Sequence, residues 1–210
     1  MGSDAAFWNG IAEKYSRSPV ANPGAFERKI EITKSRMKPS DTVLDIGCGT
    51  GSLALRLAPF AAHVHGLDVS SEMVRIANGK AAADGVHDVT FHEGPFDDAV
   101  PFAPASVDVL CAYSILHLVD DLPAALQRIH RLVKPGGSFV SSTACLRDSW
   151  VPFGPLVWAM RLVGKAPKVV QLLSAAALKD AMAAAGFVDI EAPDVGAKKM
   201  VAFFVARKPS

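Results

Sequence analysis

Short apolar runs alternate with stretches of helical periodicity along most of this chain. Buried strands are predicted where runs rich in Val, Leu and Ile end in polar or glycine residues, at 43–46, 63–68, 88–92 and 106–113. Helices are predicted between them, from about Thr50 and from Ser70 or Ser71 to about Asp84. This alternation predicts an α/β fold with helices on both faces of a doubly wound sheet.

The second half of the chain continues the alternation. A helix is predicted over 121–134, with Asp121 as its cap and Pro135-Gly136-Gly137 as its end, and a fifth strand follows. Ser174 caps a last helix over 175–185, and two final strands are predicted at 187–190 and 200–206. We find no repeat or linker, so residues 1–210 are predicted to form a single domain.

Two helices are predicted ahead of the first strand, over 4–16 and 25–37. In the first helix, Phe7, Trp8, Ile11, Ala12 and Tyr15 form one apolar stripe. Because these helices lie outside the strand order, residues 1–38 are expected to form an N-terminal helical cap.

A glycine-rich loop follows the strand at 43–46. Gly47, Gly49 and Gly51 alternate there, and residues without a Cβ let a ligand lie against the backbone. Asp68 ends the next strand, 21 positions after Gly47, where its two oxygens are placed for a ribose diol. The spacing predicts a nucleoside-type site.

Ser52 stands where the dinucleotide fingerprint G-x-G-x-x-G requires its third glycine, and the chain instead has G-x-G-x-G preceded by the acid Asp45. The run VLDIGCGTG resembles the first motif of the class I S-adenosylmethionine-dependent methyltransferases. The segments FWNGIAEKYSRS, LDVSSEMVRIA, LVKPGGSFVSSTA and AGFVDIE are also similar to that family, so the resemblance spans nearly the full chain. It implies a Rossmann-like seven-stranded sheet, mostly parallel with an antiparallel last strand, and S-adenosyl-L-methionine as cofactor.

The resemblance also implies which residues meet the cofactor. The glycine loop holds the amino-acid end and Asp68 the ribose. The implied set is Asp45, Gly47, Cys48, Gly49, Gly51, Asp68, Val69, Met73, Phe96 and Tyr113. Cys48 is expected to be a small filler and Met73 to lie under the adenine or in the helix core. Pro95 stands where the family often has an acid that accepts from adenine, so Asp97 or backbone near Phe96 is expected to replace it.

Two residues are candidates for catalysis. His117 follows the strand at 106–113, whose carboxyl end borders the ligand crevice, and it is a base near neutral pH. Tyr15 ends the first helix, which lies across the cofactor in many small methyltransferases. The alternatives are a helix-capping role for His117 and a packing role for Tyr15.

Residues 145–173 are too apolar for a solvated loop and too interrupted by proline for one long helix. In methyltransferases of this type a substrate lid follows the fifth strand. We therefore predict a lid of helical pieces and an apolar or aromatic acceptor. A dimer contact or a membrane-surface patch is the alternative.

Composition excludes several function classes. The net charge is +1, which gives no electrostatic signal for nucleic acid. No apolar run is long enough for stable membrane insertion, and residues 1–10 lack a secretion signal. Three unpaired cysteines indicate a reducing compartment, so the cytoplasm is expected. His63 and His65 share a strand face, but no third ligand is in sequence reach, and no metal site is predicted.

Three functions fit these observations. The first is a methyltransferase that transfers a methyl group to a small acceptor by in-line displacement. The second is an NAD(P)-dependent oxidoreductase, which is disfavoured by Ser52 at the third glycine position. The third is a non-catalytic cofactor-binding partner protein. The identity of the acceptor, the methylated atom and the oligomeric state stay open.

Overall fold

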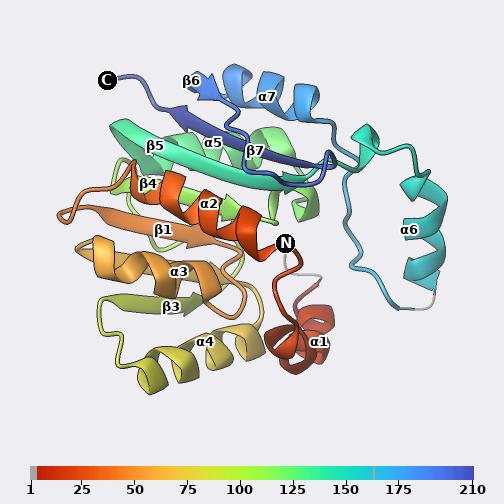
Figure 1. Ribbon diagram of the computed structural model, residues 1–210, viewed down its shortest axis with the longest axis horizontal. Helices are drawn as coiled ribbons and strands as arrows, with labels where there is room; N and C mark the ends of the chain where they lie inside the picture. The colour runs from red at the N-terminus through yellow and green to blue at the C-terminus, as the bar shows by residue number, and fades with distance from the viewer. Residues whose placement is uncertain (1–3, 163) are drawn as a thin grey trace.

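The computed structural model describes residues 4–162 and 164–210, and its seven strands form one sheet in the order β3-β2-β1-β4-β5-β7-β6 (Figure 1). The strands are β1 (Thr42–Ile46), β2 (His63–Asp68), β3 (Val89–Glu93), β4 (Val107–Tyr113), β5 (Val133–Ala144), β6 (Val188–Glu191) and β7 (Val201–Arg207). Neighbouring strands are parallel except that β7 is antiparallel to β5 and β6. The predicted mixed sheet with an antiparallel last strand is confirmed.

Seven α-helices accompany the sheet among the described residues. They are α1 (Ala5–Arg17), α2 (Pro23–Lys34), α3 (Ser52–Leu57), α4 (Ser71–Asp84), α5 (Leu122–Leu132), α6 (Phe153–Leu162) and α7 (Ala175–Ala184). Short 3-10 turns span Ala58–Phe60, Leu116–Leu118 and Leu146–Asp148. The predicted caps are confirmed, because the side chains of Ser70, Asp121 and Ser174 each accept a backbone N–H from the first turn.

Two apolar cores fix the helices on opposite faces of the sheet. One core contains Ile30 of α2 and Leu57 of α3 and continues into α4. The other contains Leu126 of α5 and Leu178 of α7. Since both faces of the central strands are covered, the carboxyl edge of the sheet is the place where a ligand can reach strand ends.

The helix predicted over 121–134 ends earlier than expected. It stops at Leu132, and Val133 is extended and pairs with Val107 at the start of β5. Pro135 disfavours the helical conformation at Lys134, so the chain leaves the helix before it. The helix expected from about Thr50 begins at Ser52, because Gly51 takes φ +78° at its N-cap.

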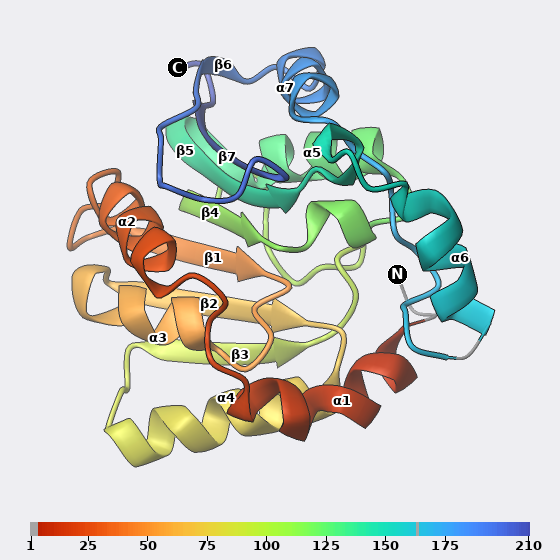
Figure 2. The ribbon, with the colours of Figure 1, turned by 45° about the vertical axis from the view of Figure 1, so that its right-hand side comes forward.

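The cap and the lid meet at the carboxyl edge of the sheet. Figure 2 shows α1 and α6 flanking the ends of β1, β2 and β3, with α1 alongside α4. In the predicted lid, a 3-10 turn and α6 are followed by an irregular return segment over 165–173. Residues 1–3 of the predicted cap and Val163 of the lid lie outside the described residues. Within the described chain, no helix is both long and apolar enough to cross a membrane.

Candidate active site

The glycine loop is tied to the end of β2. The N–H groups of Gly47 and Cys48 both donate to the carbonyl of Leu67, at 2.7 and 3.1 Å. Gly47 takes φ +65°, and a Cβ there would lie 2.7 Å from the side chain of Ile115. A larger residue at this position would therefore have to displace the loop that follows β4.

Asp68 lies at the carboxyl end of β2 and faces the loop. Its Oδ2 accepts from the N–H of Gly49 at 2.8 Å, and its Oδ1 accepts from the N–H of Ser70 at 2.9 Å. Burial raises the pKa of this carboxyl, while these N–H groups act to lower it. The contacts hold the carboxylate at the sheet edge, next to bare backbone.

Asp45, which precedes the loop, and Cys48, which lies within it, are both buried. Asp45 is buried, and desolvation, followed by the nearby charge of Asp68, raises its pKa well above the usual range. Burial likewise raises the pKa of the Cys48 thiol, which keeps it protonated. A protonated, enclosed thiol fits the filler role expected for Cys48.

A cavity of about 550 Å³ opens between the loop, α1 and the lid; we call it the central pocket. Nine of the twelve site residues named from the sequence line it: Tyr15, Gly47, Gly49, Asp68, Val69, Met73, Phe96, Tyr113 and His117. Asp45, Cys48 and Gly51 do not line it. The backbone of Gly49 faces the pocket, because only Cε1 of Tyr15, at 3.7 Å, lies near a Cβ placed there.

His117 lies in the pocket wall just after β4. Its Nδ1 is buried and has no hydrogen-bond partner among the described residues. Burial lowers the pKa of the imidazole to about 4, so the ring is neutral at neutral pH. A neutral ring nitrogen can accept a hydrogen bond or a proton from a molecule in the pocket.

The two tyrosines of the pocket differ in what their hydroxyls do. The Tyr113 hydroxyl is 2.9 Å from Thr33 Oγ1 and donates to the carbonyl of Lys29, so it is directed to α2. Tyr15 is half exposed (51%). Desolvation and then the charges of Asp68 and Asp45 raise its pKa. Its phenol therefore stays protonated at neutral pH, which argues against a role as a base.

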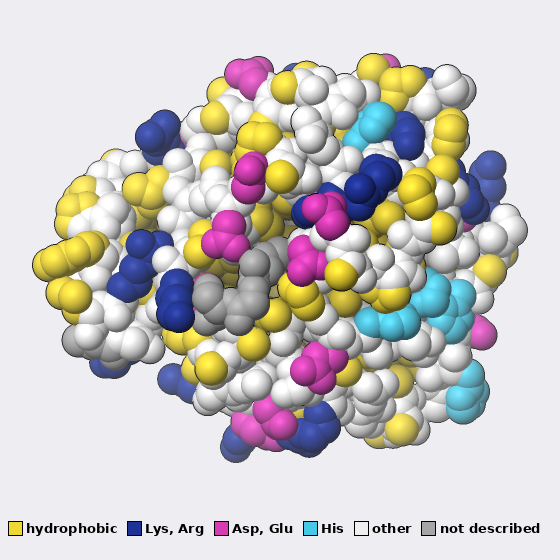
Figure 3. All heavy atoms as spheres, turned by 180° about the vertical axis from the view of Figure 1, so that it is seen from behind, with side chains coloured by type: hydrophobic (Ala, Val, Ile, Leu, Met, Phe, Trp, Pro, Cys, Tyr) yellow, Lys and Arg dark blue, Asp and Glu magenta, His cyan; other side chains and the backbone are white. Residues whose placement is uncertain are grey.

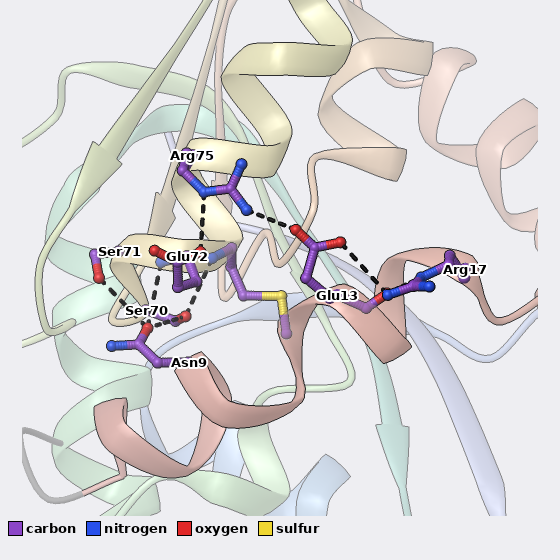
Figure 4. Close-up of polar contacts among 8 residues, drawn as sticks. Asn9, Glu13, Arg17, Ser70, Ser71, Glu72 and Arg75 are labelled. Carbon is purple, nitrogen blue, oxygen red and sulfur yellow. Dashed lines mark hydrogen bonds and ion pairs between the residues drawn. The ribbon is translucent and has the colours of Figure 1, made fainter.

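Helix α1 is fixed to the start of α4 by polar contacts (Figure 4). The Oδ1 atom of Asn9 accepts from Ser70 Oγ at 2.5 Å and from the N–H of Glu72 at 3.3 Å. Glu13 forms an ion pair with Arg75 at 2.7 Å. These contacts orient α1 so that Trp8 and Tyr15, seven residues apart on one helix face, both line the pocket.

The Pro95 segment places Phe96 at the pocket. Phe96 is buried and lines the pocket, while its carbonyl accepts from Arg128 at 3.3 Å. Asp97 accepts from the N–H of Ala99 within its own turn and does not line the pocket. Of the two substitutes expected for the adenine contact, only Phe96 is thus at the pocket wall.

Residues of the predicted lid form the remaining wall. Its pocket-lining residues are Leu146, Phe153, Leu156, Val157, Met160, Lys165, Ala166, Pro167 and Val170. All but Lys165 are apolar. The sequence singled out residues 145–173 as a predicted lid but not Lys165 within them. It also missed Ile115 and Gly94, which carry no distinctive motif and reach the pocket through strand topology.

Comparisons with known proteins agree with this geometry. A family model described as a methyltransferase domain matches residues 37–181. The uncharacterized methyltransferase YcgJ of Bacillus subtilis is 30% identical over 146 residues, which are 70% of this chain but only 55% of that protein. The demethylmenaquinone methyltransferase of Symbiobacterium thermophilum is 30% identical over 178 residues, covering 76% of this chain and 70% of that protein.

A solved structure shows the same fold. The [4+2]-cyclase SpnF superposes with a TM-score of 0.71 at 22% identity, over 99% of this chain and 93% of that chain. The family match spans well over half of the chain and includes the loop, Asp68 and the strand that leads to His117. The chain therefore belongs to the class I S-adenosylmethionine-dependent methyltransferases.

Proposed function

We propose that this protein transfers a methyl group from S-adenosylmethionine to a small apolar or aromatic acceptor. The observation that carries the proposal is that one pocket joins two unlike halves. The glycine loop and Asp68 form a polar half suited to a nucleoside, and the lid forms an apolar half. His117, whose Nδ1 has no hydrogen-bond partner in the described part of the chain, lies in the wall of the same pocket.

The charge of the polar half favours a cationic ligand. Asp45 and Asp68 lie close enough that the charge of Asp68 raises the pKa of Asp45. Asp45 is therefore held toward its neutral form, and the carboxylate of Asp68, which lines the pocket, attracts positive charge and repels the pyrophosphate of a nicotinamide dinucleotide. When bound, S-adenosylmethionine supplies an activated methyl group on a positively charged sulfur. The electrostatics therefore support this cofactor over NAD(P).

The residues of the chain fit a cofactor of this kind. Asp68 has two oxygens at the tip of β2, and the exposed backbone at Gly49 leaves room for a ligand beside the Tyr15 ring. Met73 and Phe96 supply apolar surface for a base. Tyr15 is assigned a positioning role against the reacting end of the cofactor, since its phenol stays protonated.

Methyl transfer is an in-line displacement, so catalysis depends on alignment in a site without water. Leu156, Val157 and Met160 of the lid cover the pocket with apolar side chains. We assign to the neutral imidazole of His117 the acceptance of a hydrogen bond from the acceptor, and of its proton where the acceptor is an acid. In that case the proton moves from the acceptor to the imidazole as the methyl group is transferred.

The chemical class of the acceptor is inferred from the side chains with which the lid lines the pocket. Apart from Lys165, the described lid residues that line the pocket have apolar side chains. The relative from Symbiobacterium thermophilum is named for demethylmenaquinone, a quinone, which is in line with an apolar aromatic acceptor. The three free, buried cysteines support a cytoplasmic location for the reaction.

The first test is a thermal-shift titration with S-adenosylhomocysteine in parallel with NADH and NADPH. A ligand that binds the native state raises the unfolding midpoint with concentration. We expect the unfolding midpoint to rise with S-adenosylhomocysteine and not with NADH or NADPH. Asp68→Asn should greatly reduce the rise while retaining an acceptor for the loop N–H groups, and Asp84→Asn, at the exposed end of α4, should leave it unchanged.

Turnover separates an enzyme from a non-catalytic binder. An assay with labelled S-adenosylmethionine and a panel of quinones and phenols should detect a methylated product. The variant His117→Gln should slow this methyl transfer without changing the thermal shift that S-adenosylhomocysteine causes. A shift with NADH but none with S-adenosylhomocysteine would overturn the proposal. Cofactor binding without transfer to any acceptor class would favour the partner-protein alternative.

A further inference from the structure

The outer side of the lid exposes an unusual concentration of large apolar side chains. Trp150 is 94% exposed, Leu162 68% and Trp158 64%. Helix α6 contains no buried residue, and Arg161 is its single charged side chain. Figure 3 shows hydrophobic and basic side chains together on the projecting part of the molecule that α6 forms, at the left of the view. A helix that is apolar on all sides normally has partners around it.

Basic side chains surround this apolar group. Residues 147–172 contain four basic residues and one acidic residue, a net charge of +3. The basic residues are Arg147, Arg161, Lys165 and Lys168, all exposed. None of them forms an ion pair with another described residue. The carboxylate of Asp148 is engaged, since it accepts from the N–H of Ala175 at 2.7 Å. We call the exposed apolar and basic side chains of residues 147–172 the outer lid surface.

We propose that the outer lid surface docks on an anionic lipid bilayer. Exposed tryptophans prefer the headgroup level of a bilayer, where the ring is buried and its N–H stays hydrated. Basic side chains beside them are attracted to anionic headgroups. A short helix with leucine, methionine and tryptophan side chains lies in the interface rather than across it. The surface thus has both the apolar and the electrostatic part of an interfacial anchor.

The charge argues against a second copy of this chain as the occupant. In a two-fold symmetric contact the same patch meets itself, so a net charge of +3 would face a net charge of +3. An anionic bilayer instead neutralises that charge. The complementarity therefore favours lipid over a homodimer.

Docking would also place the central pocket at the membrane. Leu156 and Met160 are partly exposed and also line the pocket, so the anchor and the pocket wall share one helix. An apolar molecule dissolved in the bilayer would then reach the pocket without crossing water. The docking itself does not depend on methyl transfer, because it is measured without cofactor or acceptor.

The test is vesicle flotation of the full chain. We expect the protein to float with vesicles of phosphatidylcholine and phosphatidylglycerol at low salt and to stay at the bottom with phosphatidylcholine alone. The double variant Trp150→Ser/Trp158→Ser and the charge-reversed Arg161→Glu/Lys168→Glu should each lower partitioning at least about tenfold. Tryptophan emission of the wild type should shift to the blue on binding.

Matched controls replace similar residues elsewhere. Val20→Ser changes an exposed apolar residue between α1 and α2, and Lys198→Glu/Lys199→Glu reverses two exposed charges before β7. Both should float like the wild type. Equal flotation of all variants, no flotation, or binding to neutral vesicles that salt does not change would overturn the proposal. A concentration-dependent dimer abolished by Trp158→Ser would assign the surface to a second copy instead. Binding of S-adenosylhomocysteine is measured in a separate experiment. The membrane-docking proposal and the methyltransferase proposal can therefore fail independently.

Discussion

The carboxylate of Asp4 accepts the backbone N–H of Lys168 at 3.0 Å, which ties the start of the chain to the lid. It also accepts from the N–H of Val169, at 3.4 Å. Although Asp4 is the N-cap residue of α1, its side chain caps no N–H of that helix. On the other side, the N–H of Gln171 donates to the carbonyl of His117 at 2.7 Å. The return segment of the lid thus bridges α1 and the loop that carries His117.

We expect Asp4→Ala to loosen the lid without unfolding the domain. A buried carboxylate with two N–H donors contributes on the order of 1–2 kcal/mol, or about a tenfold change in the population of open lid. Limited trypsin digestion checks this, since Arg161, Lys165 and Lys168 lie in the lid. Asp4→Asn, which keeps one acceptor oxygen, should give an intermediate rate. Unchanged cleavage in Asp4→Ala would show that the contact does not restrain the lid.

Asn9→Ala should weaken cofactor binding through α1. Asn9 is the partly buried contact between α1 and the start of α4, and its loss frees the helix that carries Tyr15. We expect the dissociation constant for S-adenosylhomocysteine to rise roughly fivefold to tenfold, corresponding to a lost hydrogen-bond contribution of about 1 kcal/mol. Isothermal titration calorimetry measures it.

Arg75→Ala is the matched control for Asn9→Ala. It removes the exposed ion pairs of Arg75 with Glu13 and Glu72 at the same interface. Exposed pairs contribute little, so we expect a change below about threefold. A larger effect of Arg75→Ala than of Asn9→Ala would mean that charge, rather than the amide contact, holds α1 in place.

The carboxylate of Asp68 predicts a preference for positively charged ligands. The wild type should bind sinefungin, which carries an ammonium group, more tightly than neutral S-adenosylhomocysteine, and Asp68→Asn should reduce that preference severalfold. Because burial raises the pKa of Asp68, its negative charge is lost more readily as pH falls. The preference should therefore grow as pH rises. An Asp68→Asn variant with the wild-type preference would remove Asp68 from the electrostatics of the site.

The sheet and most helix boundaries were predictable because they depend on local chemistry. Ser70, Asp121 and Ser174 each cap a helix within three residues of their own position. Glycines at 47 and 51 occur where the backbone takes positive φ. The end of α5 was missed because Val133 pairs with Val107, a contact across the sheet that outweighs the helical pattern.

The parts of the site that were not predicted depend on contacts between distant segments. Asp4 and Lys168 are separated by 164 residues, and neither position carries a motif. The direction of the Tyr113 hydroxyl depends on Thr33 in α2, which no pattern near Tyr113 reveals. Sequence identifies which elements end at the pocket, whereas side-chain direction depends on the packing of elements far apart in the chain.

Acid should destabilise the protein partly through His117. Burial lowers the folded-state pKa of His117 to about 4, whereas an unfolded histidine has a pKa of about 6.5. Below pH 6.5 the unfolded chain binds a proton that the folded chain rejects, so the contribution is complete above that pH and is lost as pH falls toward 4. Between about pH 7 and pH 5 the loss from this residue is roughly 2 kcal/mol in the free energy of unfolding.

Urea unfolding of wild type and His117→Gln at both pH values measures this contribution. His65 shares the sign, because burial and then the charges of His63 and His92 lower its pKa to about 4. The His117→Gln variant should therefore keep some acid sensitivity, and only the contribution of His117 should be lost. The exposed His87 provides the control, and His87→Gln should lose as much stability on acidification as the wild type. If His117→Gln also lost as much stability on acidification as the wild type, the His117 imidazole would be solvated in the folded state. Its assignment as a neutral acceptor of hydrogen bonds in the pocket would then be wrong.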